Sequence, residues 1–303
     1  MTVPVQRPAP GIDTRAALIL VACCAMWGFG LVMVKTANSG ISPMLNAGLR
    51  SIAAGLLLFG WTRVRGIALF SRDRTLGAGL LCGATFAVEF LTLYPGLAMT
   101  QVARATIFLH CAPFVAAYGE HVLVPGHRLT KAKVLGLGAA FAGLAVALGG
   151  GIATSSRETI TGDLLCLVGG IAWGITTVIV RASALRSAPA EKTLLYQLAV
   201  SVPFLLLGSW ALGEAGITNL SAGVVGAFAY TVIGTVAIGY TIWFWLMRSY
   251  SAASLHAFTF LTPIFGVVSG HFVLGEPVGA ATLIGLALVA FGIWLVNKPE
   301  PTG

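Results

Sequence analysis

Apolar residues dominate the chain in long runs, and each run is closed by a charge, a glycine or a proline. Ten runs can be marked, at residues 15–36, 43–62, 75–97, 101–123, 131–150, 162–182, 193–213, 221–247, 251–274 and 277–297. A run of about 20 apolar residues is long enough to cross a bilayer as a helix. The alternation of apolar and polar residues that is typical of a membrane β-barrel strand is missing. The pattern therefore predicts an all-α integral membrane protein with ten transmembrane helices.

Composition and charge agree with this interpretation. Charged residues make up only 9% of the 303 residues, whereas soluble domains carry about 25%. The net charge of +8 does not indicate a nucleic-acid partner, because the cations lie singly or in small clusters between the apolar runs. With the N-terminus inside the cell, 14 of the 18 lysines and arginines fall in inside segments, three fall outside, and Arg50 lies within a run. Cytoplasmic loops carry such an excess, so we predict that both termini are cytoplasmic.

One phrase occurs twice in the chain. "AMWGFGLVMVK" at residues 25–35 is echoed by "IAWGITTVIVR" at residues 171–181, with a constant offset of 146 residues. Trp27 then corresponds to Trp173, and the glycine after each tryptophan corresponds as well. The first phrase belongs to the first apolar run and the second to the sixth, so the echo indicates an internal repeat of five runs.

A second echo lies in the fourth and ninth runs. "QVARATIFLHCAPF" at residues 101–114 aligns with "SAASLHAFTFLTPIF" at residues 251–265, and Pro113 corresponds to Pro263. Because five is odd, the second half must enter the membrane from the side opposite to the first. Two inverted halves related by an axis in the membrane plane are an architecture of secondary transporters.

The chain as a whole resembles the EamA-type transporters of the drug/metabolite transporter superfamily. The resemblance rests on the ten runs, on Trp-Gly in the first run of each half, and on the proline in the fourth run of each half. In the second half, a short "GEP" segment (275–277) follows the run that contains this proline. The first half carries "PGHRLT" (125–130) in place of that signature. Aromatic residues inside the runs look most like the bacterial amino-acid exporters of the YddG type. The resemblance implies a multi-pass protein of the bacterial inner membrane that functions as a monomer, with five-helix repeats at residues 1–150 and 151–303.

Pro113 and Pro263 are predicted to kink their helices. Neither can donate a hydrogen bond to the carbonyl four residues earlier, which belongs to Leu109 in one case and to Thr259 in the other. Each freed carbonyl needs water, a side chain or substrate as a partner. A purely structural kink is the alternative.

Ionisable residues inside the runs are candidates for function, because an unpaired charge in lipid is costly. Glu89 lies near the middle of the third run, where it would carry a proton or bind a substrate amine; the alternative is a structural ion pair with Arg50. His110 lies one turn before Pro113 and would bind substrate or carry a proton. Its alternative role is that of a neutral side chain bonded to a backbone carbonyl. His256 lies closer to the end of its run and is therefore a weaker candidate for a functional residue.

Aromatic residues complete the expected site. Trp27 and Trp173 lie near the middle of their runs and not at the interfaces, where tryptophan is usually enriched. Tyr94, Tyr240 and Trp243 are further candidates for the wall of a central cavity. Such a wall with few fixed charges suits amphipathic solutes, since an ammonium group over these rings gains about 1–2 kcal/mol when desolvated.

These observations predict a secondary transporter that exports small metabolites, in first place aromatic or neutral amino acids, by alternating access. The alternatives are a carrier of the same fold for drugs, nucleosides or phosphorylated metabolites, and a membrane-embedded enzyme. No motif of a serine hydrolase, zinc protease, nucleotide hydrolase or dinucleotide enzyme is present. The five cysteines all lie in apolar runs and do not indicate a metal site. We therefore expect no catalysis and no cofactor, and the energy source is either a solute gradient or proton antiport.

Overall fold

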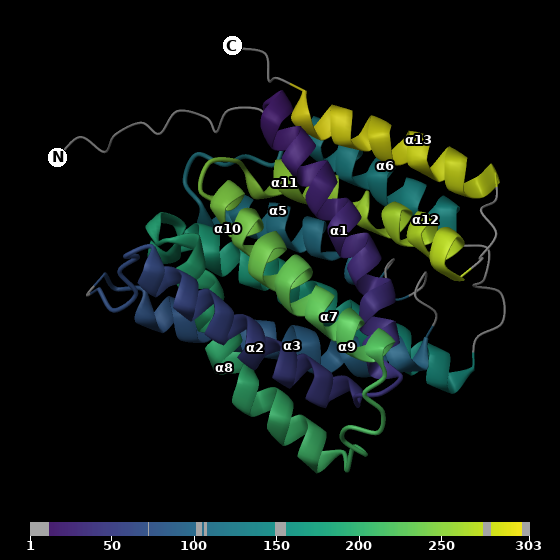
Figure 1. Cartoon of the computed structure of the whole chain (residues 1–303). Helices are drawn as coiled ribbons and strands as arrows, with labels where there is room; N and C mark the ends of the chain where they lie inside the picture. The colour runs from purple at the N-terminus through teal and green to yellow at the C-terminus, as the bar shows by residue number, and fades with distance from the viewer. Residues whose placement is uncertain are drawn as a thin grey trace.

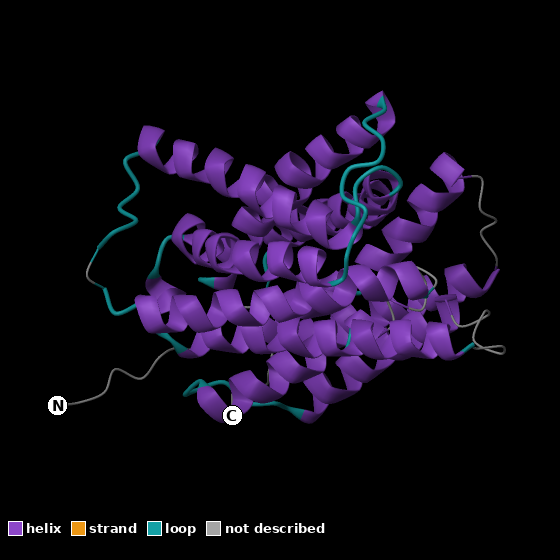
Figure 2. Ribbon diagram, turned by 90° about the horizontal axis from the view of Figure 1, so that it is seen from below, coloured by secondary structure: helices purple, strands orange, loops and turns teal. Residues whose placement is uncertain are grey.

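The computed structural model describes residues 12–71, 73–100, 105, 108–148, 156–274 and 280–298. Throughout this part the chain is helical and forms no sheet; a single antiparallel bridge joins Ile41 to Ile217. The helices run along one common direction, and most connections gather at the two ends of the bundle (Figures 1 and 2). The fold class predicted from the sequence, all-α, is confirmed.

Every apolar run contains helical residues. The helices are α1 (Thr14–Asn38), α2 (Pro43–Val64), α3 (Leu76–Met99), α5 (Ala112–Leu123), α6 (Lys131–Leu148), α7 (Arg157–Ala182), α8 (Ala190–Ala211), α9 (Ala222–Tyr230), a π-helix (Thr231–Tyr240), α10 (Thr241–Met247), α11 (Ala252–Thr259), α12 (Thr262–Leu274) and α13 (Ala280–Asn297). Among the described residues, six helices are long and apolar enough to cross a membrane, the sixth being the continuous stretch Ala222–Met247. Ten crossings therefore stay a prediction, and the junction at residues 150–151 and the "GEP" segment at 275–277 lie outside the described residues.

Polar caps decide where several helices begin. Asp13 Oδ1 accepts a hydrogen bond of 2.8 Å from the backbone N–H of Ala16 at the start of α1. Ser156 caps α7 and Ser251 caps α11 in the same way. A side-chain oxygen at this position satisfies one of the amides that the helix itself cannot pair.

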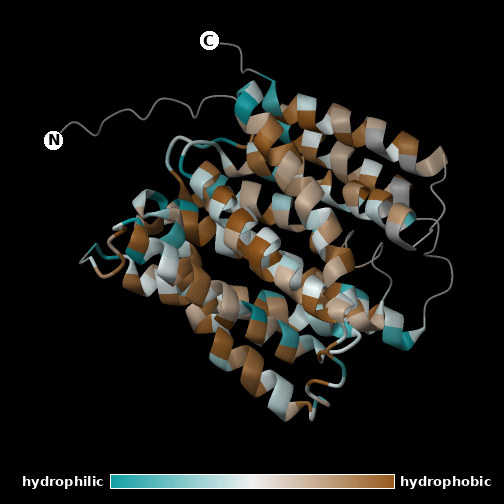
Figure 3. Ribbon diagram, viewed as in Figure 1, coloured by the Kyte–Doolittle hydropathy of each residue, from teal (hydrophilic) through white to brown (hydrophobic). Residues whose placement is uncertain are grey.

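The outer faces of the bundle are apolar, as Figure 3 shows over most helices. Large hydrophobic side chains such as Leu56, Trp210 and Phe272 are exposed. In water such a surface would be strongly unfavourable, so the arrangement is consistent with a protein that lies in a membrane.

The two repeat-related prolines lie where helices stop and restart. Helix α5 begins at Ala112 with Pro113 in its first turn, directly after a turn at residues 110–111. Helix α11 ends at Thr259, and α12 begins at Thr262 with Pro263 as its second residue. A proline in the first turn of a helix leaves no hydrogen bond unmade, so the chain breaks beside each proline and begins a new helix.

The first helix of each sequence half packs against the broken helix of the other half. A Cβ atom added to Gly28 of α1 would lie 2.6 Å from the carbonyl oxygen of Thr262 at the start of α12. A Cβ atom added to Gly174 of α7 would lie 2.6 Å from Cβ of Val115 in α5. Only glycine permits such close approach, and small residues are typical of helix contacts in membranes.

A second pair of contacts repeats at opposite ends of the bundle. The hydroxyl of Tyr250 donates to Asp13 at 2.7 Å, beside the start of α1. The hydroxyl of Thr100 donates to Asp163 at 2.8 Å, near the start of α7. The two aspartates are 150 residues apart in the sequence, and so are Thr100 and Tyr250. Each contact again joins one sequence half to the other.

The bundle has two edges on either side of its central helices α1, α7 and the π-helix. Helices α6 and α13 lie side by side along one edge, and α2, α3 and α8 form the opposite edge (Figure 1). Gly136 and Gly292 bring α6 and α13 together, because a Cβ on either would lie within 3 Å of the partner backbone. The centre is left to α1, α7 and the π-helix, and it holds the cavity described next.

Candidate functional site

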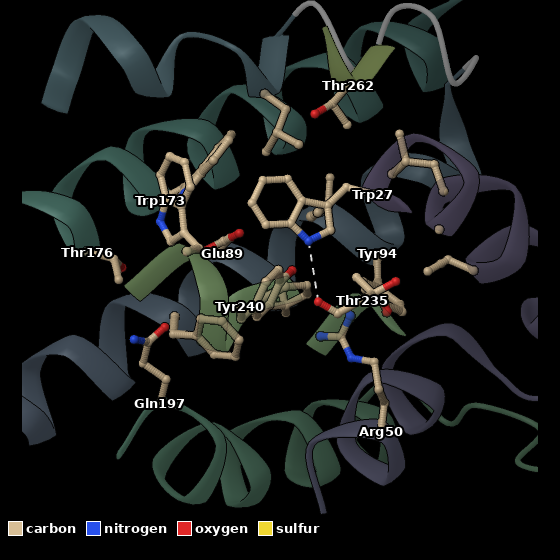
Figure 4. Close-up of a pocket in the computed structure, with 18 of the residues that line it drawn as sticks. Trp27, Arg50, Glu89, Tyr94, Trp173, Thr176, Gln197, Thr235, Tyr240 and Thr262 are labelled. Carbon is tan, nitrogen blue, oxygen red and sulfur yellow. Dashed lines mark hydrogen bonds between the residues drawn. The ribbon is translucent and has the colours of Figure 1, made fainter. Parts of the chain in front are cut away.

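A pocket of about 990 Å³, its mouth included, lies between α1, α2, α3, α7, α8 and the π-helix with α10. All seven cavity residues predicted from the sequence line it: Trp27, Glu89, Tyr94, His110, Trp173, Tyr240 and Trp243. Most of them are labelled in Figure 4. The seven residues therefore line one common pocket, as the sequence predicted, whereas their role in substrate binding stays a prediction.

Aromatic rings in edge contact form the wall of this pocket. The Trp27 ring lies 5.6 Å from that of Trp243 and 6.0 Å from that of Tyr240. The ring of Trp173 lies 6.4 Å from Trp243 on the other side. Such pairs gain about 0.5–1.5 kcal/mol beyond the burial of area. These contacts pack the rings of the wall against one another.

The π-helix shapes the space around Trp27. The indole Nε1 donates to the carbonyl oxygen of Thr235 over 3.4 Å (Figure 4). A Cβ atom on Gly239 would lie 2.5 Å from the same nitrogen, so only glycine leaves room for the indole. π-Helical turns are rare and often occur at functional sites. No signal in the sequence indicates this winding.

His110 bonds to a backbone carbonyl. Its Nε2 lies 2.9 Å from the carbonyl oxygen of Thr259 and donates to it. This oxygen is the one that Pro263 leaves without its helical partner. The contact matches the structural alternative for His110, while the ring still lines the pocket 6.0 Å from that of Trp173.

His256 lies deeper than the sequence indicates. It is completely buried beside the pocket, with its ring 5.0 Å from the rings of both Trp173 and Trp243. Its Nε2 lies 3.0 Å from the hydroxyl oxygen of Thr177. The sequence analysis gave His256 less weight as a site residue because it lies close to the end of its run, but α11 starts at the buried residue Ala252, so His256 is enclosed by the bundle.

Arg50 and Glu89 both line the pocket, but they do not form an ion pair within the described residues. The Arg50 Cζ atom lies 4.4 Å from the centre of the Phe90 ring and 5.4 Å from that of Tyr94. The sequence suggests Arg50 only as the partner of Glu89 in the alternative, structural interpretation, and Arg50 is not among the predicted cavity residues. Small polar residues that line the wall were also missed, since single threonines and glutamines in an apolar run give no distinct signal: Thr176, Thr177, Gln197, Thr235 and Thr262.

A buried ion pair between Glu120 and Arg181 joins helices at one end of the bundle. Glu120 of α5 accepts hydrogen bonds from Arg181 of α7 at 2.8 and 2.9 Å, and both side chains are 4% exposed. The second carboxylate oxygen accepts from the N–H of Ala252 at 2.9 Å, and Arg181 also donates to the carbonyl of Met247. This cluster ties α5, α7, α10 and α11 together.

A more exposed ion pair lies at the same end. Lys192 of α8 contacts Asp73 at 2.7 Å, in the connection before α3. The hydrogen bond from Lys192 holds the pKa of Asp73 well below its usual range, and bonds from Thr75 and Ser71 act in the same direction. Like the buried cluster, this pair joins the two halves of the sequence.

Comparisons with known proteins were made for the whole chain. The model of the family described as "EamA-like transporter family" matches residues 14–149 and 160–298. The "Uncharacterized transporter YvbV" of Bacillus subtilis is 26% identical over 94% of this chain and 92% of its own length. The "Uncharacterized inner membrane transporter YedA" of Escherichia coli K12 is 23% identical over 92% of this chain and 89% of its own. A solved structure titled "Crystal structure of protein" superposes with a TM-score of 0.76 at 17% identity, over 93% of this chain and 96% of that one, and so shares the fold.

Proposed function

Because the chain belongs to the EamA-like transporter family, we propose that this membrane transporter exports small metabolites, in first place aromatic and neutral amino acids, by alternating access. The aromatic pocket with one cation and one carboxylate among its described residues carries this proposal. The rings suit an apolar side chain, and the two charges suit a carboxylate and an ammonium. The family and the relatives are named as transporters, which favours a transporter over a membrane-embedded enzyme.

We further propose ten spans in two inverted repeats, residues 1–150 and 151–303, with both termini in the cytoplasm of a bacterial inner-membrane protein. The exchanged contacts of Gly28 and Gly174 support this arrangement, since each repeat supplies the first helix to the broken helix of the other. The YddG-type exporters are the subgroup that best fits the aromatic wall. One chain holds the complete pocket, which supports a monomer as the functional unit.

We also propose that, in this arrangement, the structure corresponds to an outward-facing state. The pocket extends along α1 from Trp27 to Val34 and along α3 from Phe86 to Leu97, toward the end of the bundle where both helices finish. The Glu120–Arg181 cluster lies at the other end, which the cation count assigns to the cytoplasm. Export then requires this cluster to open while the outer mouth closes.

Counterflow in proteoliposomes tests the proposed substrate. Vesicles preloaded with unlabelled phenylalanine should transiently accumulate labelled phenylalanine from outside, and protein-free vesicles should not. A matched series with leucine, aspartate and lysine should show that the neutral side chains are preferred. If none of these amino acids moves in vesicles that contain folded protein, the proposed substrate class is wrong.

The same assay addresses the second candidate, a carrier for drugs, nucleosides or phosphorylated metabolites. The broad aromatic wall would admit a nucleobase or a drug ring. A phosphate dianion fits less well, because Arg50 is the one cation among the described lining residues and Glu89 shares the pocket. Counterflow of uridine, or of a hexose phosphate, in vesicles that do not move amino acids would favour this candidate.

A further inference from the structure

Arg50 is a cation inside a helix of the bundle that forms no salt bridge with a described carboxylate. It lies in the third turn of α2 and is 2% exposed. Charged residues at such depth are costly, and those that persist usually serve a function or are paired. Its guanidinium instead lies over aromatic rings, with Cζ 4.4 Å from the centre of the Phe90 ring and 5.4 Å from that of Tyr94.

Ring contacts stabilise the charge through the face of the guanidinium and leave its N–H groups unsatisfied. Nε and Nη2 of Arg50 are buried and have no hydrogen-bond partner. These two nitrogens share one edge of the planar group. That edge binds a carboxylate through two parallel hydrogen bonds, which is the arrangement that arginine forms best.

The surroundings of this edge are those of a binding subsite. Arg50 reaches from α2 toward Thr235 and Tyr94 in the pocket (Figure 4). The hydroxyls of Thr235 and Tyr94 are also buried without hydrogen-bond partners. Several unpaired polar atoms in one pocket are unusual in a native protein, and a single anionic group placed among them would satisfy them together.

We propose that Arg50 binds the carboxylate of the transported solute, with Tyr94 and Thr235 as supporting donors. This inference rests on the proposed function, and it specifies how the amino acid is oriented in the pocket, with its carboxylate at Arg50. Glu89 lines the same pocket and receives the ammonium group, while the side chain lies against Trp27, Trp173 and Trp243. A monoanionic carboxylate matches a single guanidinium edge, whereas a phosphate dianion would face Glu89 with only one cation to oppose it.

Binding of three probes to purified protein tests the subsite through quenching of the tryptophan fluorescence in the pocket. Phenylalanine has both charges, 3-phenylpropanoate lacks the ammonium, and phenylalaninamide lacks the carboxylate. In Arg50→Gln, the affinities for phenylalanine and 3-phenylpropanoate should fall by roughly 10- to 100-fold, while that for phenylalaninamide should change by less than about threefold. Arg50→Lys should recover part of the loss, because it restores the charge without the two-nitrogen edge.

Arg63→Gln is the matched control, since Arg63 lies on the same helix and also stacks on a ring, that of Phe59, but is exposed outside the pocket. It should leave all three affinities unchanged. Equal losses for all three probes in Arg50→Gln, or no loss for the two carboxylates, would overturn the subsite. If the protein binds 3-phenylpropanoate through Arg50 but neither binds nor moves amino acids, the subsite stands and the proposed function fails. Phenyl phosphate as a fourth probe separates the anions; tighter binding than 3-phenylpropanoate would contradict a carboxylate site.

Discussion

At the scale of single residues, Trp173 is the centre of the aromatic wall. Its ring contacts His110, Trp243 and His256 at 5.0 to 6.4 Å. Trp173→Ala should lower counterflow about tenfold, since it removes ring contacts with the solute that contribute about 1 kcal/mol or more. The protein should still insert and fold. Trp294→Ala is the control, because Trp294 lies exposed on α13; normal transport by Trp173→Ala would show that this wall does not touch the solute.

A second prediction at the scale of single residues concerns Glu89 and the energy source of transport. It is 7% exposed, lines the pocket and has no salt bridge to Arg50. If export is proton antiport, Glu89→Gln should abolish the response of transport to a pH gradient, because a glutamine cannot carry the proton. Counterflow should be weaker, since the contact with the substrate ammonium is lost, but it should remain measurable. Uptake into vesicles with and without an imposed pH gradient measures this. Wild-type transport that ignores the gradient would instead establish facilitated diffusion.

The sequence identified seven residues that line the pocket, but it missed Arg50 and the small polar residues of the wall, and it did not reveal how the lining residues are paired. Mid-run tryptophans and tyrosines are informative because interfacial belts are their usual place. Trp27 and Trp173 could be placed by this rule alone. The pairing of Arg50 with rings and not with Glu89 depends on distances between helices, which a linear sequence does not contain.

At the scale of helices, the close contact at Gly28 makes a direct prediction. Gly28→Ala would place a methyl group within 3 Å of backbone atoms of Thr262 and Gly266. We expect a loss of about 1–3 kcal/mol, as in other overpacked sites, which would be measured as a lower melting temperature in detergent. Gly60→Ala on α2 is the control, since its Cβ would meet nothing within 4 Å. Equal melting temperatures for the two variants would contradict the close contact of α1 with α12.

Breaks and windings of helices were predictable only in part. Pro113 and Pro263 marked the breaks because proline removes a backbone donor, yet the prediction was a kink and the structure has a new helix at each position. The π-helix Thr231–Tyr240 carries no such marker. It packs against Trp27 through Gly239, and this contact joins segments that are distant in the sequence.

At the scale of the whole molecule, the buried Glu120–Arg181 pair should hold the closed end together. Glu120→Gln leaves a buried guanidinium without its counter-charge, a change that costs about 3–5 kcal/mol. Hydrogen exchange at the amides around Ala252, which Glu120 caps, should accelerate more than tenfold. Asp73→Asn removes the more exposed pair at the same end and should accelerate exchange far less. Equal effects of the two variants would show that the buried pair is not the main closure.

Which helices are neighbours could not be obtained from the pattern of apolar positions. In a membrane, the lipid-facing side and the packed side of a helix are both apolar, so periodicity does not point to the partner. The repeated Trp-Gly phrase gave the useful signal, because it identified Gly28 and Gly174 as equivalent. Their contacts with opposite halves then emerged only from the structure.

The exchange of contacts between halves has a consequence for biosynthesis. Cys24 of α1 donates to the carbonyl of Phe258, a residue made 234 positions later. At ribosomal speeds of about 5–20 residues per second, α1 waits on the order of 10–50 s for this neighbour. During that interval its glycine face is covered by lipid or by the insertion machinery. The packing of α1 is therefore incomplete until the ninth apolar run has left the ribosome.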